Sequence, residues 1–420
     1  MYETEQEIEK VILVAVCSNP NQDPEESLDE LEELVKTAGA TVVGRMIQNL
    51  EHASSATYIG SGKVEELKDL IWKTEATAVV CDDELTPAQY KNLEDELDVK
   101  VMDRTLIILD IFAGRAKTAE GKIQVELAQL RYRSTRLIGM RNLSRQGGGI
   151  GTRGPGEKKL ETDRRHIERR MNDIKSELSQ LKSTRNTQRA RREKNHIPVV
   201  ALVGYTNSGK SAIMNRILSM SGKADKNVFE ENMLFATLDT QQRSVDMENG
   251  HKFILIDTVG FVSKLPHSLI EAFKATLEEV TYADLLLHVV DSSYDNHDFH
   301  IEVTDKVMKE VGAGNKEKIM VFNKCDLPHE HIVPEIGVEN IEISAKTGYN
   351  LELLLQKVEE KLFGDYMYSK MLIPFNRGDI SSYLCSEADV KMMEYKADGT
   401  YFELKMKKSD YQRFKEYEIV

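Results

Sequence analysis

The stretch Gly204-Tyr205-Thr206-Asn207-Ser208-Gly209-Lys210-Ser211 decides how the rest of the chain is interpreted. An apolar run at 197–203 precedes it and predicts a buried parallel strand, and apolar residues with helical spacing follow at 212–218. Such a loop turns backbone N–H groups and a helix N-terminus toward one point, where they can bind a polyphosphate. We therefore predict a phosphate-binding loop, in which Lys210 contacts the β and γ phosphates and the Ser211 hydroxyl binds Mg²⁺.

A second apolar run, at 253–257, ends in the segment Asp257-Thr258-Val259-Gly260. A carboxylate at the end of such a strand can hold Mg²⁺ through its water shell, and the Gly260 N–H can contact the γ phosphate. Between this strand and the phosphate-binding loop lies Phe235-Ala236-Thr237-Leu238-Asp239. There the Thr237 hydroxyl is the expected second Mg²⁺ ligand, with Thr240 as the alternative. Lys210, Thr237 and Gly260 are the expected catalytic residues.

Two further segments predict which base is bound. The run Asn323-Lys324-Cys325-Asp326 follows another buried strand, and Ser344-Ala345-Lys346 follows a short one. The Asp326 carboxylate can accept from both N1–H and the 2-amino group of guanine, whereas adenine would leave it unpaired. We expect the Ala345 N–H to face guanine O6. The sequence therefore predicts an enzyme that binds GTP and GDP and hydrolyses GTP to GDP and phosphate.

Two positions near the phosphates bear on the rate of hydrolysis. Phe261 follows Gly260, where Ras-like enzymes carry a glutamine that orients the attacking water. Phenylalanine cannot do this, so we predict slow intrinsic hydrolysis that a partner accelerates. Asn207 either helps to hold a K⁺ ion beside the phosphates or braces the loop.

The charge of the chain is unevenly distributed. The 420 residues carry a net charge of −14, but residues 131–195 hold 19 Lys or Arg against 7 Asp or Glu. This segment has a charge of +12, so the remainder carries −26. One concentrated basic segment in an acidic protein favours contact with a phosphate backbone, although long helices also carry charge to stay solvated.

Other features predict a reduced, cytoplasmic protein. Its four cysteines, Cys17, Cys81, Cys325 and Cys385, are too widely separated to indicate a disulfide framework or a zinc site. We expect no membrane span, because no apolar run approaches about 18 residues, and peripheral association with membranes is left open. A monomer is expected.

The chain divides into four predicted parts. Repeated strand–helix units indicate a small α/β domain at 1–112, in which Ser27 is expected to cap the first helix. Its Gly60-Ser61-Gly62-Lys63 is read either as a turn before a helix or as a second phosphate contact. A basic helical hairpin follows at 113–195, with a glycine-rich tip at 144–156 that can follow an RNA surface or serve as a linker.

The fold class expected for the remainder is α/β, with a P-loop GTPase domain at 196–363 and a small α+β domain at 364–420. The GTPase domain should have a mostly parallel sheet with helices on both faces. In the last domain, Asp379 is expected to cap a helix, and Asp398-Gly399 is expected to turn a β-hairpin.

The glycine-rich segment at 147–157, the following run at 160–165 and the phosphate-binding loop resemble the HflX family of ribosome-associated GTPases. The resemblance implies GTP-dependent binding to the large ribosomal subunit, with the hairpin tip at rRNA near the peptidyl-transferase region. It also implies dissociation or rescue of stalled ribosomes. Three positions depart from the family pattern: Ala212, Lys158 and Thr240. The alternatives are a large-subunit assembly GTPase and a GTP-switch adaptor that binds RNA or protein.

Overall fold

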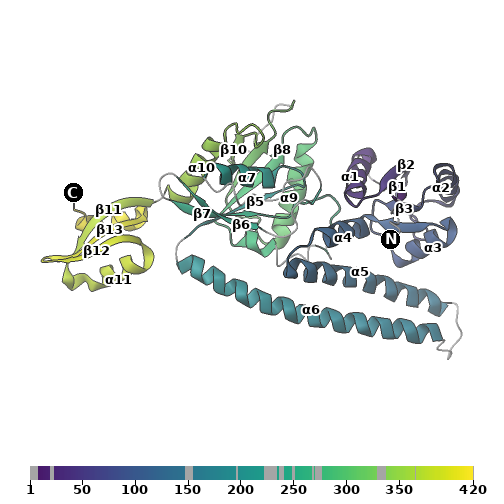
Figure 1. Cartoon of the computed structure of the whole chain (residues 1–420), viewed down its shortest axis with the longest axis horizontal. Coiled ribbons are helices and arrows are strands. Elements are labelled where there is room, and N and C mark those ends of the chain that lie inside the picture. The colour runs from purple at the N-terminus through teal and green to yellow at the C-terminus, as the bar shows by residue number, and fades with distance from the viewer. Residues whose placement is uncertain are drawn as a thin grey trace, which may run out of the picture.

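The computed structural model contains three separate β-sheets and a long helical hairpin (Figure 1). The chain begins in one small α/β layer, passes through the hairpin into the largest sheet, and ends in a small antiparallel sheet. The structure describes residues 8–18, 23–146, 155–194, 197–221, 234–235, 241–247, 251–266, 269, 277–328, 337–364 and 366–419.

The N-terminal part forms a four-stranded parallel sheet in the order β2-β1-β3-β4. Leu28, Leu31 and Leu34 of α1 are fully buried against one face, while α2 and α3 cover the other. The predicted strand–helix alternation is therefore confirmed. The elements are β1 (Lys10–Cys17), α1 (Pro24–Thr37), β2 (Thr41–Asn49), α2 (Ser61–Thr74), β3 (Ala78–Cys81), α3 (Pro87–Leu97) and β4 (Lys100–Asp103).

Ser27 does not cap α1. The helix begins three residues earlier, and the Asp23 side chain accepts the capping hydrogen bond from the Glu25 N–H. Pro24 at the first helical position lacks an N–H and so fits this start. The Ser27 hydroxyl instead donates to Asp82 at 2.7 Å.

The helical region divides into α4 (Arg104–Arg115), α5 (Ala119–Gln146) and α6 (Pro155–Lys194). In Figure 1, α5 and α6 lie side by side along one edge of the molecule. Ile174, in the predicted apolar stripe of α6, is fully buried. Arg170 of α6 pairs through two nitrogens with Glu126 of α5 at 2.7 and 2.8 Å. The predicted tip lies largely outside the described residues, because 147–154 are not among them.

The central sheet has six strands in the order β10-β9-β8-β5-β7-β6, and only β6 is antiparallel to its neighbour. Helices α7 and α10 cover one face, and α9 covers the other. This confirms the mostly parallel P-loop fold. Its elements are β5 (Val199–Gly204), α7 (Lys210–Met220), β6 (Gln241–Asp246), β7 (Lys252–Asp257), β8 (Leu285–Asp291), α9 (His297–Val311), β9 (Lys318–Asn323), β10 (Glu339–Glu342) and α10 (Leu351–Phe363).

The C-terminal part is a three-stranded antiparallel sheet, β11-β13-β12, with the predicted hairpin turning just before Gly399. Phe402 is fully buried beneath it. Asp379 is the second residue of α11 and does not cap this helix; its side chain pairs with Arg377 at 3.1 Å. The elements are β11 (Tyr366–Ile373), η2 (Phe375–Arg377), α11 (Gly378–Glu387), β12 (Asp389–Lys396), β13 (Gly399–Lys407), α12 (Lys408–Phe414) and η3 (Lys415–Tyr417).

Among the described residues, no helix combines the length and the apolar character needed to cross a bilayer.

Candidate nucleotide-binding site

The predicted phosphate-binding loop joins the end of β5 to the start of α7, as the sequence pattern requires. Gly209 has a φ of +94°, and a Cβ there would lie 2.2 Å from the Asn323 side-chain nitrogen. Only glycine combines that backbone conformation with such a close neighbour. The loop therefore presents backbone at the helix N-terminus, where N–H groups can bind phosphate oxygens.

Lys210 is held inside the loop. Its ammonium donates to the carbonyls of Gly204 at 3.0 Å and Tyr205 at 2.6 Å, and only 6% of the residue is exposed. Burial lowers the pKa of Lys210 to about 8, although the Asp257 carboxylate acts in the opposite direction. A nucleotide phosphate would supply the negative charge that this position lacks.

Two of the residues expected to hold Mg²⁺, Ser211 and Asp257, lie together. The Ser211 hydroxyl donates to Asp257 at 2.7 Å, and Asp257 is fully buried at the end of β7. Hydroxyl and carboxylate oxygens are ligands that Mg²⁺ prefers, so these side chains fit the ion. Mg²⁺ bound here would neutralise charge on the β and γ phosphates. Thr237 and Thr240 lie outside the described residues.

Two more hydroxyls of the loop are buried without hydrogen-bond partners among the described residues. They are the Oγ atoms of Thr206, which is 6% exposed, and Ser208, which is 1% exposed. Buried polar groups in proteins are almost always paired. Partners from a bound ligand are therefore consistent with this loop, whereas an ordinary turn leaves the two hydroxyls unexplained.

The segment after Asp257 lies directly on the phosphate-binding loop. The Thr206 N–H donates to the Phe261 carbonyl at 2.7 Å, and the Phe261 N–H donates to the Gly204 carbonyl at 3.2 Å. The Thr258 hydroxyl donates to a β5 carbonyl, and the Val259 side chain is buried. The Phe261 side chain is 1% exposed and packs into the apolar core on the α9 side of the sheet. No polar side chain at position 261 is available to orient water.

The predicted guanine-binding segments meet the phosphate-binding loop through Asn323. Its side-chain amide donates to the Ser208 carbonyl at 2.9 Å and accepts from the Ala345 N–H at 3.0 Å. In this structure the N–H therefore bonds to Asn323, and its contact with guanine O6 stays a prediction. The buried Asn323 oxygen needs a donor, and the Ala345 N–H is the one within reach.

Asp326 stands at the exposed edge of the same region, as a base-binding carboxylate should. It accepts from the Ser344 hydroxyl at 2.7 Å, and this hydrogen bond lowers the pKa of Asp326, so the carboxylate is charged at neutral pH. Lys324 pairs with Asp291 at 2.6 Å. The Cys325 N–H donates to the carbonyl of Ile343, which fixes the turn, and Lys346 is exposed.

The segment expected to sense the γ phosphate is described only at its start. The Phe235 ring packs edge-on against Phe112 of α4, with the ring centroids 4.6 Å apart, so its side chain belongs to the hydrophobic core. Ala236, Thr237, Leu238 and Asp239 lie outside the described residues.

Tyr205 also points away from the phosphates, toward the N-terminal domain, where its hydroxyl donates to Glu30. Nothing in the sequence marks Glu30 or its partner Arg104, which lie in the first domain and carry no motif.

Three features lie at the carboxyl ends of parallel strands in one sheet and together define a P-loop GTPase. They are the phosphate-binding loop, the buried Asp257 beside Ser211, and the segment Asn323–Asp326. Family models agree. They describe residues 25–113 as a GTP-binding GTPase N-terminal region, 115–192 as a GTP-binding GTPase middle region, and 199–324 as a 50S ribosome-binding GTPase.

Curated relatives match over nearly the whole chain. The GTPase HflX of Lacrimispora saccharolytica is 50% identical over 396 residues, covering 94% of this chain and 92% of that protein. The GTPase HflX of Escherichia coli is 40% identical over 381 residues, covering 89% and 88%. A solved GTP-binding protein from Sulfolobus solfataricus in complex with GDP is 24% identical, covers 84% of this chain and 99% of that chain, and has a TM-score of 0.43.

The chain belongs to the HflX family of GTPases. It binds GTP and hydrolyses it to GDP and phosphate.

Proposed function

We propose that this GTPase binds the large ribosomal subunit and uses its GTP switch to dissociate or rescue stalled ribosomes. The observation that supports this most directly is the basic hairpin of α5 and α6, which extends along one edge of the molecule (Figure 1). Residues 131–195 carry 19 basic against 7 acidic residues in an otherwise acidic chain. Such a segment suits rRNA, because neutralising phosphates releases counterions. The matching family model for a 50S ribosome-binding GTPase adds to the argument.

The proposed chemistry follows from the site. The Lys210 ammonium moves from loop carbonyls onto the β and γ phosphates, and Ser211 and Asp257 would hold Mg²⁺, which would neutralise charge on those phosphates. The Gly260 N–H and the Thr237 hydroxyl contact the γ phosphate and its ion. Asp326 selects guanine, while Asn323 keeps the base and phosphate segments together.

We further propose that hydrolysis is slow until the large subunit is bound. Phe261 lies in the core and leaves no side chain at its position to orient water. A ribosome that orders the segments expected to contact the γ phosphate, 235–239 and 257–260, or that supplies polar groups there, would accelerate hydrolysis. Asn207 is an exposed residue of the phosphate-binding loop, and we propose that its side chain helps to hold K⁺ beside the phosphates. GTP turnover in KCl compared with NaCl tests that role, and equal rates would remove it.

The decisive experiment is GTP turnover by the full-length protein with purified large subunits, small subunits or neither. We expect stimulation by large subunits alone. Sedimentation then separates the family alternatives, because splitting converts assembled ribosomes into subunits, whereas an assembly defect leaves immature particles. No stimulation and no cosedimentation with large subunits would favour the GTP-switch adaptor instead.

A charge-reversal pair tests the hairpin itself. Arg165 and Arg169 are exposed on α6, and Lys370 and Lys396 are exposed on the C-terminal sheet as matched controls. The double change of the two arginines to glutamate should weaken ribosome binding and flatten its salt dependence while leaving GDP affinity unchanged. Ribosome binding that responds equally to both pairs would contradict the role of the hairpin.

A further inference from the structure

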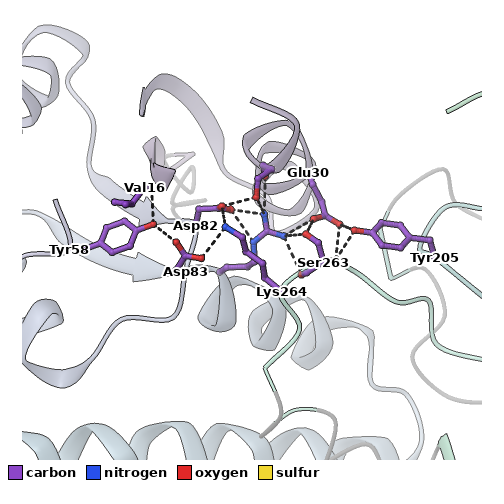
Figure 2. A network of polar contacts seen from close by, with 10 residues as sticks. Val16, Glu30, Tyr58, Asp82, Asp83, Tyr205, Ser263 and Lys264 are labelled. Carbon is purple, nitrogen blue, oxygen red and sulfur yellow. Dashed lines mark hydrogen bonds and ion pairs between the residues drawn. The ribbon is translucent and has the colours of Figure 1, made fainter. Parts of the chain in front are cut away.

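A carboxylate of the N-terminal domain reaches two segments of the nucleotide site. Glu30, on α1, accepts from the Tyr205 hydroxyl in the phosphate-binding loop and from the Ser263 hydroxyl (Figure 2). The Ser263 N–H donates to the Tyr205 oxygen at 2.6 Å and to Glu30 at 3.3 Å. Ser263 lies three residues after Gly260, whose N–H is expected to contact the γ phosphate. Glu30 therefore contacts both the phosphate-binding loop and the segment that contains Gly260.

Two basic side chains and a second carboxylate surround the contact between Glu30 and Ser263. Arg104, which is 1% exposed, donates to Glu30 at 2.7 Å, to the Ser263 hydroxyl at 3.1 Å and to Asp82 at 2.5 Å. Lys264, the next residue of the same segment, pairs with Asp82 on the other side (Figure 2). Burial by itself would raise the pKa of Glu30, but the charge of Arg104 and the hydrogen bonds outweigh it and lower that pKa. The carboxylate is therefore ionised at neutral pH.

Apolar contacts hold the same segment. Val259, just before Gly260, and Val262, two residues after it, are buried in one cluster with the core of the N-terminal domain. Phe235 joins that cluster through its contact with Phe112. Phe235 and the segment 259–262 both belong to regions expected to contact the γ phosphate, and both pack against the N-terminal domain. A movement of either would therefore change the interface between the N-terminal and GTPase domains.

The described arrangement leaves little room beside Gly260. A Cβ added there would lie 2.7 Å from the Thr206 Cα and 3.1 Å from the Lys210 ammonium. Gly260 is therefore in close contact with the phosphate-binding loop, and a side chain at this position would displace it. The Gly260 N–H is the group expected to contact the γ phosphate. Any shift of Gly260 when the γ phosphate binds or leaves would pass through the next three residues to Ser263 and its contact with Glu30.

We propose that Glu30 is a positioning residue of the GTP site that couples docking of the N-terminal domain to whether the site holds GDP or GTP. Its carboxylate holds Ser263 and Tyr205, from the two segments beside the expected γ phosphate, against the N-terminal domain. Because coupling between two sites is reciprocal, the nucleotide changes docking of the domain by the same factor as docking changes the nucleotide preference. This coupling involves only the nucleotide site and the N-terminal domain, and it does not require the ribosome.

Affinities of the full-length protein for GDP and for a non-hydrolysable GTP analogue test the proposal. Glu30→Gln removes the charge that accepts from Ser263, so the ratio of the affinity for the analogue to that for GDP should change about tenfold, as loss of one charge-assisted hydrogen bond permits. Glu26→Gln is the matched control. Glu26 lies one turn earlier on α1 and accepts from Tyr294 at 2.7 Å and Asn296 of the GTPase domain, in the same interface.

The ratio of the two affinities decides the outcome. We expect it to change in Glu30→Gln and, in the same direction, in Ser263→Ala, and to stay constant in Glu26→Gln. Hydrogen exchange of amides in α1 gives a second measurement, and in the unmodified protein its rate should differ between the analogue and GDP. Three results would each overturn the proposal. The ratio of the affinities for the analogue and GDP could stay unchanged in Glu30→Gln, or it could change equally in Glu26→Gln. The third is hydrogen exchange in α1 that is the same with either nucleotide.

Discussion

Nucleotide binding should take up a proton at Lys210. In the free protein, burial lowers the pKa of Lys210 to about 8, because its ammonium is surrounded by loop atoms and contacts only two carbonyls. Phosphate oxygens would stabilise the charged form and raise that pKa in the complex. The lysine pKa is thus low without nucleotide and higher with it, so affinity is highest below pH 8 and falls as the pH rises through 8.

The size of the effect follows from that pKa. Between pH 7.5 and pH 9 the protonated fraction of a group with a pKa of 8 falls from roughly 0.76 to roughly 0.09. The affinity for GDP should therefore fall about eightfold over this range, in which the nucleotide phosphates are already ionised. At pH 8.5 binding should take up about three quarters of a proton.

Calorimetry in two buffers with different ionisation enthalpies measures this proton uptake directly. Lys210→Arg is the control, because a guanidinium stays protonated throughout the range. Any binding that this variant retains should be independent of pH. A flat affinity for the unmodified protein from pH 7.5 to pH 9, with no proton uptake, would show that Lys210 is already fully charged in the free loop and would refute the reasoning.

Three further predictions concern other parts of the structure. Asn323→Ala removes the buried hydrogen bonds to Ser208 and Ala345 and should cost about 2–4 kcal/mol of nucleotide-bound stability, measured by denaturant unfolding with saturating GDP. A loss below 1 kcal/mol would mean that the loops hold together without it. Asp326→Asn should lower GTP affinity at least about a hundredfold and favour xanthosine nucleotides in competition binding, and an unchanged base preference would remove its role. Phe402→Ala, at a fully buried position, should destabilise the C-terminal domain by about 3–5 kcal/mol in its unfolding transition while GDP affinity stays constant; a fall in that affinity would show coupling between the two domains.

The elements and the GTPase class were predictable from local sequence. The helix at Pro87–Leu97 carries its own capping residues, and the strand at 78–81 is a short apolar run. The loop at 204–211 and the segment at 323–326 encode their chemistry through residue types at fixed spacing. Such patterns are local, so they can be recognised before the fold is known.

Contacts between distant elements were not predictable. Tyr205 and Glu30 are 175 residues apart and belong to different domains. The Ala345 N–H, expected at the base, bonds to Asn323, because only the folded sheet brings these two loops together. Local spacing was enough to predict which segments bind phosphate, metal and guanine. Tertiary packing decided that the phosphate-binding loop and the segment after Gly260 are held by the N-terminal domain, since apolar periodicity reveals a buried face without revealing its partner.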